Sequence, residues 1–372
     1  MGIRSCKGKR SMKTKIVTIG KTESGKTESP ESIEEKLAEA GGIIRQGGLV
    51  AFPTETVYGL GGDALNPESS RKIYAAKGRP CDNPLIVHIA ELSYLERIVC
   101  DIPGKAQKLA DAFWPGPLTM IFRKAAVVPK QTTGGLDTVA VRMPSHPVAS
   151  SFIKKAGGYV AAPSANLSGK PSPTLAKYVI QDMDGRIDMI IDAEGVEIGL
   201  ESTIVDVTGA VPMILRPGYI TQQMLSAVVG ETDMDVTIYD SSSPQAPKAP
   251  GMKYRHYAPR GELVIVEGEP QQVVRYINEQ TALHEAEGKR TGIIGTQETI
   301  AQYHAFSIKN AGSRSDAKAV GRRLYTFLRE FDDENISYIY AESFEEAFED
   351  KGFGQAVMNR LLKAAGHKVV HV

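Results

Sequence analysis

The fold prediction rests mainly on the stretch Pro53–Ile89, PTETVYGLGGDALNPESSRKIYAAKGRPCDNPLIVHI. It begins as a loop after the apolar run Leu49–Phe52 and ends in a second apolar run, Leu85–Ile89. Threonines, pairs of neighbouring cationic residues, an asparagine and a histidine lie between the two runs, and glycines between 59 and 62 would let a ligand approach the backbone closely. Apolar strands that deliver polar loops are typical of an α/β sheet with a binding site at its strand ends.

Length and composition predict two soluble domains. A chain of 372 residues exceeds what one ordinary core accommodates, and its 42% apolar and 24% charged content is that of a globular protein. Lys plus Arg equals Asp plus Glu at 44 each, so any anion site must come from local clustering of cations. Three cysteines without a CxxC pair argue against structural zinc or a disulfide framework and favour the cytoplasm. No apolar run approaches the ~18 residues of a membrane span.

The N-terminal residues predict a flexible arm over positions 1–29. The first 15 residues are basic and lack the apolar segment of a secretory signal. GKTESGKT at Gly20–Thr27 matches the phosphate-binding pattern GxxxxGK[ST], and KIVTIG, which ends at Gly20, could be a strand before it. The helix that such a loop requires meets Pro30 almost at once, and no apolar strand ending in Asp supplies a magnesium partner. We therefore interpret the match as a coincidence; an ATPase that uses Lys26 is the alternative.

Hydrophobic periodicity predicts a twisted, mixed α/β sheet in a domain over residues 30–240, rather than a barrel. Apolar residues at helical spacing between Ile33 and Ile44 indicate a helix over Pro30–Gln46. Further helices are expected from 66, over 103–114, 147–156 and 222–229, and strands over 49–52, 85–89, 119–122, 139–144, 159–163, 189–191, 202–207 and 213–215.

The segment 241–260 is rich in proline and serine, which is the composition of an interdomain linker. Its end, Lys253–Tyr257, combines charged and aromatic residues that a plain spacer does not need. We expect this segment to contact the active site or close it, with packing on the domain surface as the alternative. Residues 261–372 then alternate strand and helix, which predicts a smaller, parallel, Rossmann-like α/β domain. No chemistry is assigned to that domain.

Four cationic residues of the first domain lie at strand edges or in short loops beside proline or glycine: Lys77, Arg79, Arg142 and Arg216. In a chain without net charge, this clustering favours a receptor for polyphosphate or carboxylate. Loops of small residues add hydroxyl and amide groups at Ser164, Asn166, Ser168, Ser172, Ser202 and Thr203. Neither a Ser-His-Asp order nor HExxH is present, so nucleotidyl transfer by positioning and charge neutralisation fits better than nucleophilic or metal-dependent hydrolysis.

Seven ordered motifs carry a resemblance to a known family: FPTETVYGLG, KGRPxxNPLIVHI, WPGPLT, VAVRMP, APSANLSGKPSPT, ESTIVD and LRPG. Together they resemble the YrdC-like domain. With GMKYRHYAP and the trailing α/β domain, the chain is similar to the long two-domain threonylcarbamoyl-AMP synthases from about Ile33 to its C-terminus. The resemblance implies a deep basic cavity that converts L-threonine, bicarbonate and ATP, with Mg²⁺, into threonylcarbamoyl-AMP, pyrophosphate and water. A downstream transferase would pass the threonylcarbamoyl group to adenosine in tRNA.

The same resemblance assigns residues to the two substrates. The implied threonine contacts are Thr56, His88, Arg142, Ala162 and Ser202. The implied ATP contacts are Lys77, Arg79, Asn83, Thr138, Ser164, Asn166, Ser172, Arg216 and Tyr257. Lys77, Arg79 and Arg216 would stabilise the charge of the leaving pyrophosphate; no protein nucleophile and no protein ligand to a metal is assigned. For His88, a place in the hydrophobic core is the alternative.

Two other functions compete with the synthase. YrdC-like domains have a basic concave face, so the alternative is an RNA-binding module without synthase activity; contact with tRNA is also compatible with the synthase. Zero net charge and the lack of interleaved aromatic residues weaken the RNA-binding alternative. A carbamoyl transferase of the hydrogenase-maturation type would carry CxxC zinc modules, which this chain lacks.

Overall fold

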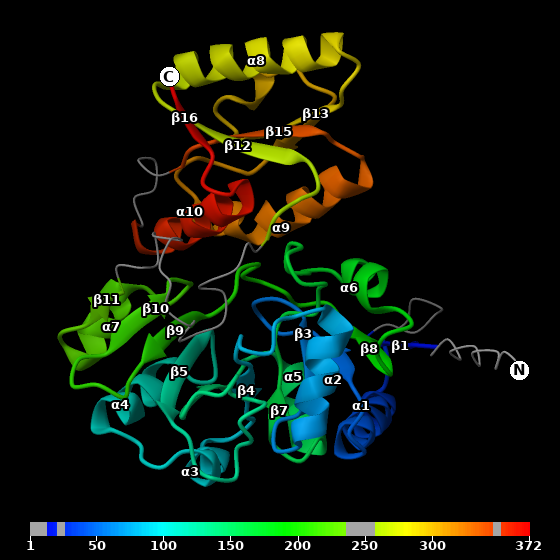
Figure 1. Cartoon of the computed structure of the whole chain (residues 1–372), viewed down its shortest axis with the longest axis vertical. Coiled ribbons are helices and arrows are strands. Elements are labelled where there is room, and N and C mark those ends of the chain that lie inside the picture. Colours follow the sequence, from blue (N-terminus) through cyan, green and yellow to red (C-terminus); the bar gives the residue numbers. More distant parts are fainter. Residues whose placement is uncertain (1–12, 21–26, 236–256, 345–350) are drawn as a thin grey trace, which may run out of the picture.

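The computed structural model describes residues 13–20, 27–235, 257–344 and 351–372. In this part of the chain two β-sheets form, one from strands between residues 15 and 234 and the other from strands between 262 and 371 (Figure 1). The predicted α/β class, with a twisted mixed sheet and a second α/β domain, is confirmed. No helix in the described part of the chain has the length and apolar character needed to cross a membrane.

The first sheet mixes parallel and antiparallel neighbours in the order β1-β8-β2-β3-β7-β4-β6-β5-β9-β10-β11. Its strands are β1 (Lys15–Thr18), β2 (Val50–Phe52), β3 (Gly59–Asp63), β4 (Ile86–His88), β5 (Leu118–Arg123), β6 (Thr138–Arg142), β7 (Val160–Ala161), β8 (Met189–Asp192), β9 (Thr203–Asp206), β10 (Met213–Arg216) and β11 (Asp233–Met234). Strands from distant parts of the sequence are therefore neighbours. The parallel pairing of β4 with β6, for example, sets His88 opposite Arg142.

Helices cover both faces of this sheet. They are α1 (Pro30–Arg45), α2 (Pro67–Lys77), α3 (Leu95–Ile98), α4 (Gly104–Phe113), α5 (Pro147–Lys155), α6 (Ala176–Met183) and α7 (Gln222–Val229), with a 3₁₀ turn at Leu92–Tyr94. Side chains alternate along a strand, so Phe52 packs with α1 and α5 on one face, whereas Ala51 belongs to the core beneath α2, α4, α6 and α7. Both faces of the central strands are consequently dry.

Local sequence determines both ends of α2, and the C-terminal end of this helix positions two cationic residues. The Asn66 side chain accepts a hydrogen bond from the Glu68 amide at 2.9 Å, and Pro67 is the first helical residue. Gly78 ends the helix with φ of 62°, a left-handed conformation that glycine adopts without strain. Lys77 and Arg79 flank this turn, so the end of α2 holds both residues just before β4.

The glycine-rich segment after Tyr58, expected to be a loop, forms strand β3. A Cβ atom at Gly61 would lie 2.8 Å from Val160 Cγ1, and one at Gly62 would lie 3.0 Å from Ile73 Cδ1. These two glycines therefore make room for side chains of the protein's own core rather than for a ligand.

The predicted flexible arm over 1–29 is wrong for the residues that the structure describes. Strand β1 pairs in parallel with β8 from Lys15 to Thr18, and Val17 is buried against that edge of the sheet. The Thr14 hydroxyl donates to the Ile187 carbonyl at 2.7 Å. Backbone pairing with the otherwise open edge of β8 supplies the order that a local pattern could not predict. Residues 1–12 and 21–26, which include most of GKTESGKT, lie outside the described residues.

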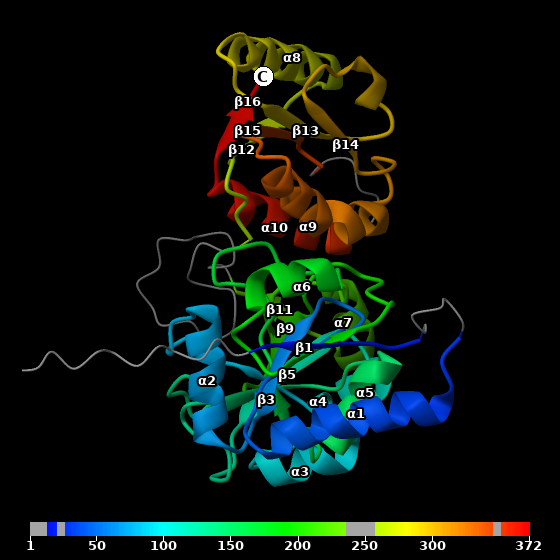
Figure 2. The ribbon, with the colours of Figure 1, turned by 90° about the vertical axis from the view of Figure 1, so that its right-hand side faces the viewer.

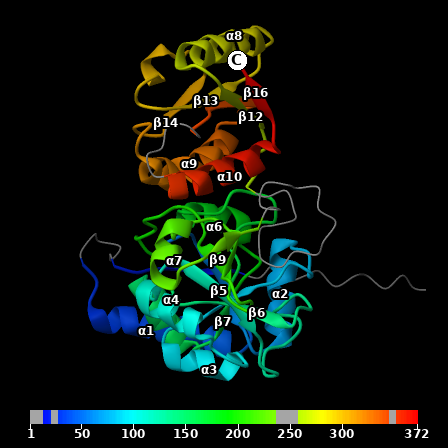
Figure 3. The same ribbon diagram turned by 90° about the vertical axis from the view of Figure 1, so that its left-hand side faces the viewer.

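The second sheet is parallel throughout, in the order β14-β13-β15-β12-β16. Its elements are β12 (Glu262–Glu267), α8 (Pro270–Ala286), β13 (Thr291–Gly295), a 3₁₀ turn at Ile300–Gln302, β14 (Ser307–Asn310), α9 (Ala317–Asp333), β15 (Tyr338–Glu342), α10 (Lys351–Ala365) and β16 (Val369–His371). Helix α8 covers the outer face, whereas α9 and α10 lie between this sheet and the first domain (Figures 2 and 3). Val57 and Leu200 of the first domain share a buried cluster with Tyr325 and Phe353 of the second. The domains thus meet through a joint apolar core.

Candidate active site

One cavity in the first domain collects most of the predicted site residues. It encloses about 750 Å³ of space, part of it open to solvent. The predicted residues that line it are Thr56, Lys77, Arg79, His88, Arg142, Ala162, Ser164, Asn166, Ser202, Arg216 and Tyr257. Asn83, Thr138 and Ser172 do not line it. Segments more than a hundred residues apart meet here because β2, β3, β4, β6, β7, β9 and β10 belong to one sheet.

Lys77, at the end of α2, is almost fully enclosed, with 2% of its surface exposed. Its ammonium group donates to the main-chain oxygens of Ser164, at 2.5 Å, and of Asn166. Burial first, and then the neighbouring charge of Arg79, lowers the pKa of Lys77 well below its ordinary value. Because carbonyl oxygens do not neutralise the ammonium charge, an anion beside it would be strongly favoured.

Arg79 is held by the turn that follows it. Its Nε donates to the Asn83 carbonyl at 3.2 Å, and its Nη2 donates to Asn83 Oδ1 at 2.6 Å and to the Pro84 carbonyl at 3.0 Å. Burial lowers the pKa of Arg79 to about 10. Asn83 therefore orients a cavity cation instead of facing the cavity itself.

Arg216, the last residue of β10, reaches across to the start of β9. Its Nε donates to the Ser202 carbonyl at 3.0 Å and its Nη2 to Ser202 Oγ at 3.1 Å. The Ser202 hydroxyl also lies 2.7 Å from Thr119 Oγ1 on β5. Burial lowers the pKa of Arg216. Three adjacent strands thus fix a guanidinium group and a hydroxyl at one wall of the cavity.

Arg142 has a carboxylate partner, whereas the described hydrogen bonds of Lys77 and Arg79 go to neutral oxygens. Its Nη1 donates to Thr56 Oγ1 at 2.8 Å, and its Nη2 lies 2.7 Å from Glu55 Oε1. Both side chains are buried. Among the described residues, neither Arg142 Nη2 nor either Glu55 carboxylate oxygen has a hydrogen-bond partner, so the contact with Glu55 is an ion pair without a hydrogen bond. Each terminal nitrogen carries two N–H groups, and the hydrogen bond to Thr56 uses one N–H of Nη1. Arg142 can therefore offer a pair of donors to a ligand while Glu55 holds it in place.

His88 is a neutral side chain at the cavity wall. Burial first, and then the charge of Arg142, lowers its pKa to about 3. Its ring meets Phe52 edge-on with the ring centroids 6.1 Å apart, and Nδ1 lies 3.2 Å from the Ile86 carbonyl. His88 therefore combines the two expected roles. Its ring packs against Phe52 in the core, and the side chain also lines the cavity.

The segment 163–174 forms part of the cavity wall and contacts Lys77 directly. The Ser164 hydroxyl donates to Asn166 Oδ1 at 2.5 Å, and the Asn166 amide donates to the carbonyls of Leu167 and Lys170, both at 2.9 Å. The Gly169 carbonyl accepts a hydrogen bond from the Ala258 amide at 2.9 Å. The end of the predicted linker therefore touches this segment directly.

Tyr257 is the residue of Lys253–Tyr257 that the structure describes, and it is buried. Its ring stacks on Tyr325 of α9 with centroids 5.2 Å apart, and the Arg360 guanidinium carbon lies 5.8 Å from its centroid. Residues 253–256, for which a contact with the site is expected, lie outside the described residues. The C-terminal domain supports the one linker side chain that can be placed at the cavity.

Sequence reasoning missed carboxylates that organise the cavity. Glu201 lines it and accepts hydrogen bonds from Ser172 Oγ at 2.5 Å, Tyr325 at 2.9 Å and Arg360 Nε at 3.0 Å. Ser172 therefore acts on Glu201 rather than lining the cavity. Thr138, by contrast, is half-buried at the start of β6, at the opposite end of that strand from Arg142. Glu55 and Glu201 belong to the motifs PTET and ESTIVD, so their position in a motif was the available signal.

The donor set of the cavity does not suit a metal held by the protein. Among the described residues, no group of three or more His, Cys, Asp or Glu side chains is placed to hold a metal ion. Glu201 is the one carboxylate among the described residues that line the cavity, and its oxygens are engaged by Ser172, Tyr325 and Arg360.

Comparison with known proteins shows the family. A protein-family model described as "Telomere recombination" matches residues 42–218, and one described as "Threonylcarbamoyl-AMP synthase, C-terminal domain" matches residues 220–366. The chain is 45% identical over 360 residues to the threonylcarbamoyl-AMP synthase of Bacillus subtilis, which spans 96% of this chain and 100% of that protein. This chain belongs to the threonylcarbamoyl-AMP synthase family.

The threonylcarbamoyl-AMP synthase of Pyrococcus abyssi is also similar, with 48% identity over 343 residues, 92% of this chain and 98% of that protein. The crystal structure of P. abyssi Sua5 complexed with L-threonine superimposes with a TM-score of 0.87 at 45% identity, covering 96% of this chain and 100% of that chain. The predicted resemblance to two-domain threonylcarbamoyl-AMP synthases, and with it a nucleotidyltransferase function, is confirmed. The comparisons favour the synthase over the RNA-binding module.

Proposed function

We propose that the cavity makes threonylcarbamoyl-AMP with its cations divided between two substrates, ATP on Lys77, Arg79 and Arg216 and L-threonine on Arg142. One observation carries this division. The described hydrogen bonds of Lys77 and Arg79 go to neutral oxygens, and burial lowers the pKa of each. Arg216 lines the same cavity, and burial lowers its pKa too. Buried cations whose hydrogen bonds go to neutral oxygens gain most from a multiply charged anion such as a polyphosphate.

The reaction begins with carboxylation of the threonine amino group by bicarbonate. The threonine nitrogen forms a bond to the carbon of bicarbonate, and water leaves, which gives a carbamate. A carbamate oxygen then attacks the α-phosphorus of ATP in line, a new phosphorus–oxygen bond forms, and the bond to the β-phosphate oxygen breaks. The products are threonylcarbamoyl-AMP and pyrophosphate. Positioning and electrostatic stabilisation supply the catalysis, because no step needs a protein nucleophile.

The threonine end would be built from Arg142, Thr56, His88, Ser202 and the Ala162 backbone. One N–H of each Arg142 terminal nitrogen can bind the threonine carboxylate through two parallel hydrogen bonds. Neutral His88 would exchange a single hydrogen bond without repelling the ammonium or carbamate. The L-threonine complex of the P. abyssi relative supports threonine as a substrate of this cavity.

The ATP end would be built from Lys77, Arg79, Ser164, Asn166, Arg216 and Tyr257, with Asn83 and Ser172 acting on Arg79 and Glu201. For Thr138, which does not line the cavity, only the motif supports a nucleotide contact. Because the cavity's carboxylate is already engaged, Mg²⁺ would enter on the phosphates of ATP. We further propose residues 30–240 as the catalytic domain, a cytoplasmic location and a downstream transferase that acts on tRNA.

The test is a substrate survey with the purified full chain. ATP, Mg²⁺ and bicarbonate are supplied with each amino acid in turn, and pyrophosphate and the adenylate are followed by mass spectrometry. Pyrophosphate release that requires both threonine and bicarbonate is expected. Release that ignores threonine would contradict the proposal. So would steeply salt-dependent RNA binding without any ATP consumption, which is the result expected of an RNA-binding module.

A further inference from the structure

Helix α9 of the C-terminal domain holds one end of the segment 163–174, which forms a wall of the cavity. The Arg329 guanidinium donates to the Pro171 carbonyl twice, from Nε at 3.0 Å and from Nη2 at 2.6 Å. One turn earlier, Thr326 Oγ1 lies 2.9 Å from Thr174 Oγ1. Arg329 is 3% exposed, so water cannot replace these contacts cheaply.

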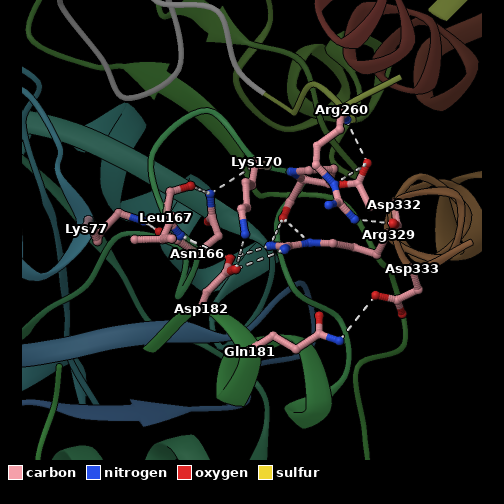
Figure 4. A network of polar contacts seen from close by, with 11 residues as sticks. Lys77, Asn166, Leu167, Lys170, Gln181, Asp182, Arg260, Arg329, Asp332 and Asp333 are labelled. Carbon is pink, nitrogen blue, oxygen red and sulfur yellow. Dashed lines mark hydrogen bonds and ion pairs between the residues drawn. The ribbon is translucent and has the colours of Figure 1, made fainter. Parts of the chain in front are cut away.

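The same arginine reaches a carboxylate that holds this segment at two more points. Arg329 Nη2 lies 2.7 Å from Asp182 Oδ2 and its Nη1 lies 3.2 Å from Oδ1. Asp182 also accepts from the Leu167 amide at 3.1 Å and from Lys170 Nζ at 2.7 Å (Figure 4). Burial alone would raise the pKa of Asp182, but Arg329 and then Lys170 hold it below its ordinary value. The carboxylate therefore stays ionised and binds all three donors.

The other end of the segment carries the groups that face the ligand. Ser164 and Asn166 line the cavity, and their main-chain oxygens accept the hydrogen bonds of Lys77. Figure 4 shows this continuous chain of contacts, with Arg329 pointing from α9 to Asp182 and Lys77 at the far side of the segment. A short path of hydrogen bonds thus joins α9 to a buried cation of the cavity.

Helix α9 has little freedom to move away from this position. Gly199 has φ of 80°, and a Cβ atom there would lie 2.5 Å from Arg322 Cα. The first domain therefore approaches the backbone of α9 as closely as glycine permits. Leu200, the next residue, is fully buried in the cluster that contains Tyr325. The helix is a rigid support for Arg329.

We propose that Arg329 is a positioning residue for ATP: by fastening Pro171 and Asp182 it fixes the segment 163–174 so that Ser164, Asn166 and Lys77 meet the nucleotide. The C-terminal domain thereby contributes to catalysis without touching the substrate. This inference rests on the proposed assignment of those three residues to ATP. The threonine end should be spared, because the described contacts of Arg142 are with Thr56, Glu55 and Gly116, outside the segment.

The test compares Arg329→Met with Arg323→Met. Both substitutions remove an arginine from α9, but Arg323 is exposed and its described hydrogen bond goes to Asn310 in its own domain. Arg329→Met is expected to raise the KM for ATP by about tenfold or more, as loss of a supporting contact does at other sites, with the KM for threonine close to wild type. Arg329→Lys should restore part of the loss, because an ammonium cannot serve Pro171 and Asp182 as a planar fork does. Arg323→Met should match wild type.

Two results would overturn the inference: an unchanged KM for ATP in folded Arg329→Met, or an equal rise of both KM values, which indicates general loosening. If Arg329→Met does not fold, Asp182→Asn keeps the shape of the side chain and must still raise the KM for ATP selectively. A normal KM for ATP in Asp182→Asn then contradicts the inference. A wild-type chain that releases no pyrophosphate with threonine contradicts the proposed function instead, so the two failures are distinguishable.

Discussion

Two regions of the molecule bury arginines in opposite ways. In the cavity, Arg79 and Arg216 donate to carbonyl, amide and hydroxyl oxygens, and burial lowers the pKa of both. At the domain interface, Arg329 and Arg360 are ion-paired with Asp182 and Glu201. Burial would lower the pKa of Arg360 too, but Tyr257 and Glu201 beside it raise it above its ordinary value.

The difference shows that burial alone does not reveal the role of a charged residue. An interface arginine already has its counter-ion, so its charge serves the contact between the two domains. Arg79 in the cavity donates to neutral oxygens, so its charge is available to a ligand, at a cost to the stability of the free protein. Substitutions in the two regions should therefore separate activity from stability.

Arg142, which is both a cavity arginine and an ion-paired one, should show the largest combined effect. Arg142→Met is expected to lower threonine-dependent pyrophosphate release by about 100-fold or more and the free energy of unfolding by about 3 kcal/mol, because Glu55 stays buried without its partner. The double variant Arg142→Met/Glu55→Gln should recover stability but not activity. Turnover and urea unfolding measured on both variants check this, and recovery of turnover in the double variant would exclude the threonine role of Arg142.

Arg360→Met should affect stability most. It leaves the Glu201 carboxylate buried and removes the donor to the Pro217 carbonyl, so the free energy of unfolding should fall by about 3–5 kcal/mol. Arg360→Met/Glu201→Gln should be more stable than the single variant, since no uncompensated charge remains. Chemical unfolding monitored by circular dichroism gives both values. A double variant no more stable than the single one would show that the ion pair is not the cause.

Arg79→Met should lower turnover strongly and stability only slightly, the opposite of what is expected for Arg360→Met. Loss of a buried cation that faces a polyphosphate should lower turnover by about 100-fold. The free energy of unfolding should change by only about 1–2 kcal/mol, because the lost hydrogen bonds to Asn83 and Pro84 are partly offset by removal of a desolvated charge. Steady-state kinetics and urea unfolding on the same sample test this. Equal stability losses in Arg79→Met and Arg360→Met would remove the distinction between the two regions.

The smallest effect is a pH dependence set by Glu201. Burial would raise its pKa, but the charges of Arg360 and then Arg216 hold it below the ordinary value. A carboxylate with a lowered pKa in the folded state stabilises the protein above the unfolded-state pKa of about 4.3, and this contribution is lost as the pH falls through the folded-state pKa. Stability measured from pH 7 to pH 3 should fall less steeply in Glu201→Gln than in the wild type. Identical slopes would contradict the assignment.

Local patterns were sufficient for most helices and for the cavity cations. Asn66, Pro67 and Gly78 mark both ends of α2, and the two cationic residues beside its C-terminal turn both line the cavity. Strand β3 was missed because its glycines lack the side chains that β-propensity depends on, and their purpose becomes visible only when Val160 and Ile73 pack against them. The run KIVTIG indicates a possible strand at β1, but the arm around it was expected to be flexible because its order comes from β8, more than 170 residues away.

The counter-ions of the site could not be predicted because they, like the partner strand of β1, come from distant parts of the sequence. Glu55 and Glu201 lie in motifs, but nothing nearby in the sequence says that Arg142 or Arg360 neutralises them. Arg329 and Arg360 lie on helices whose apolar spacing predicts an ordinary amphipathic surface. Their partners are 147 and 159 residues away, so only the packed interface identifies them.

The close packing of α9 against Gly199 limits which C-terminal domains from related proteins can replace that of this enzyme. A hybrid in which residues 261–372 come from a relative replaces the arginines of two interdomain ion pairs, while their partners Asp182 and Glu201 stay in the first domain. Such a hybrid works only when donor and recipient agree at those two sites and keep glycine at 199, so the two halves of the gene must evolve in step.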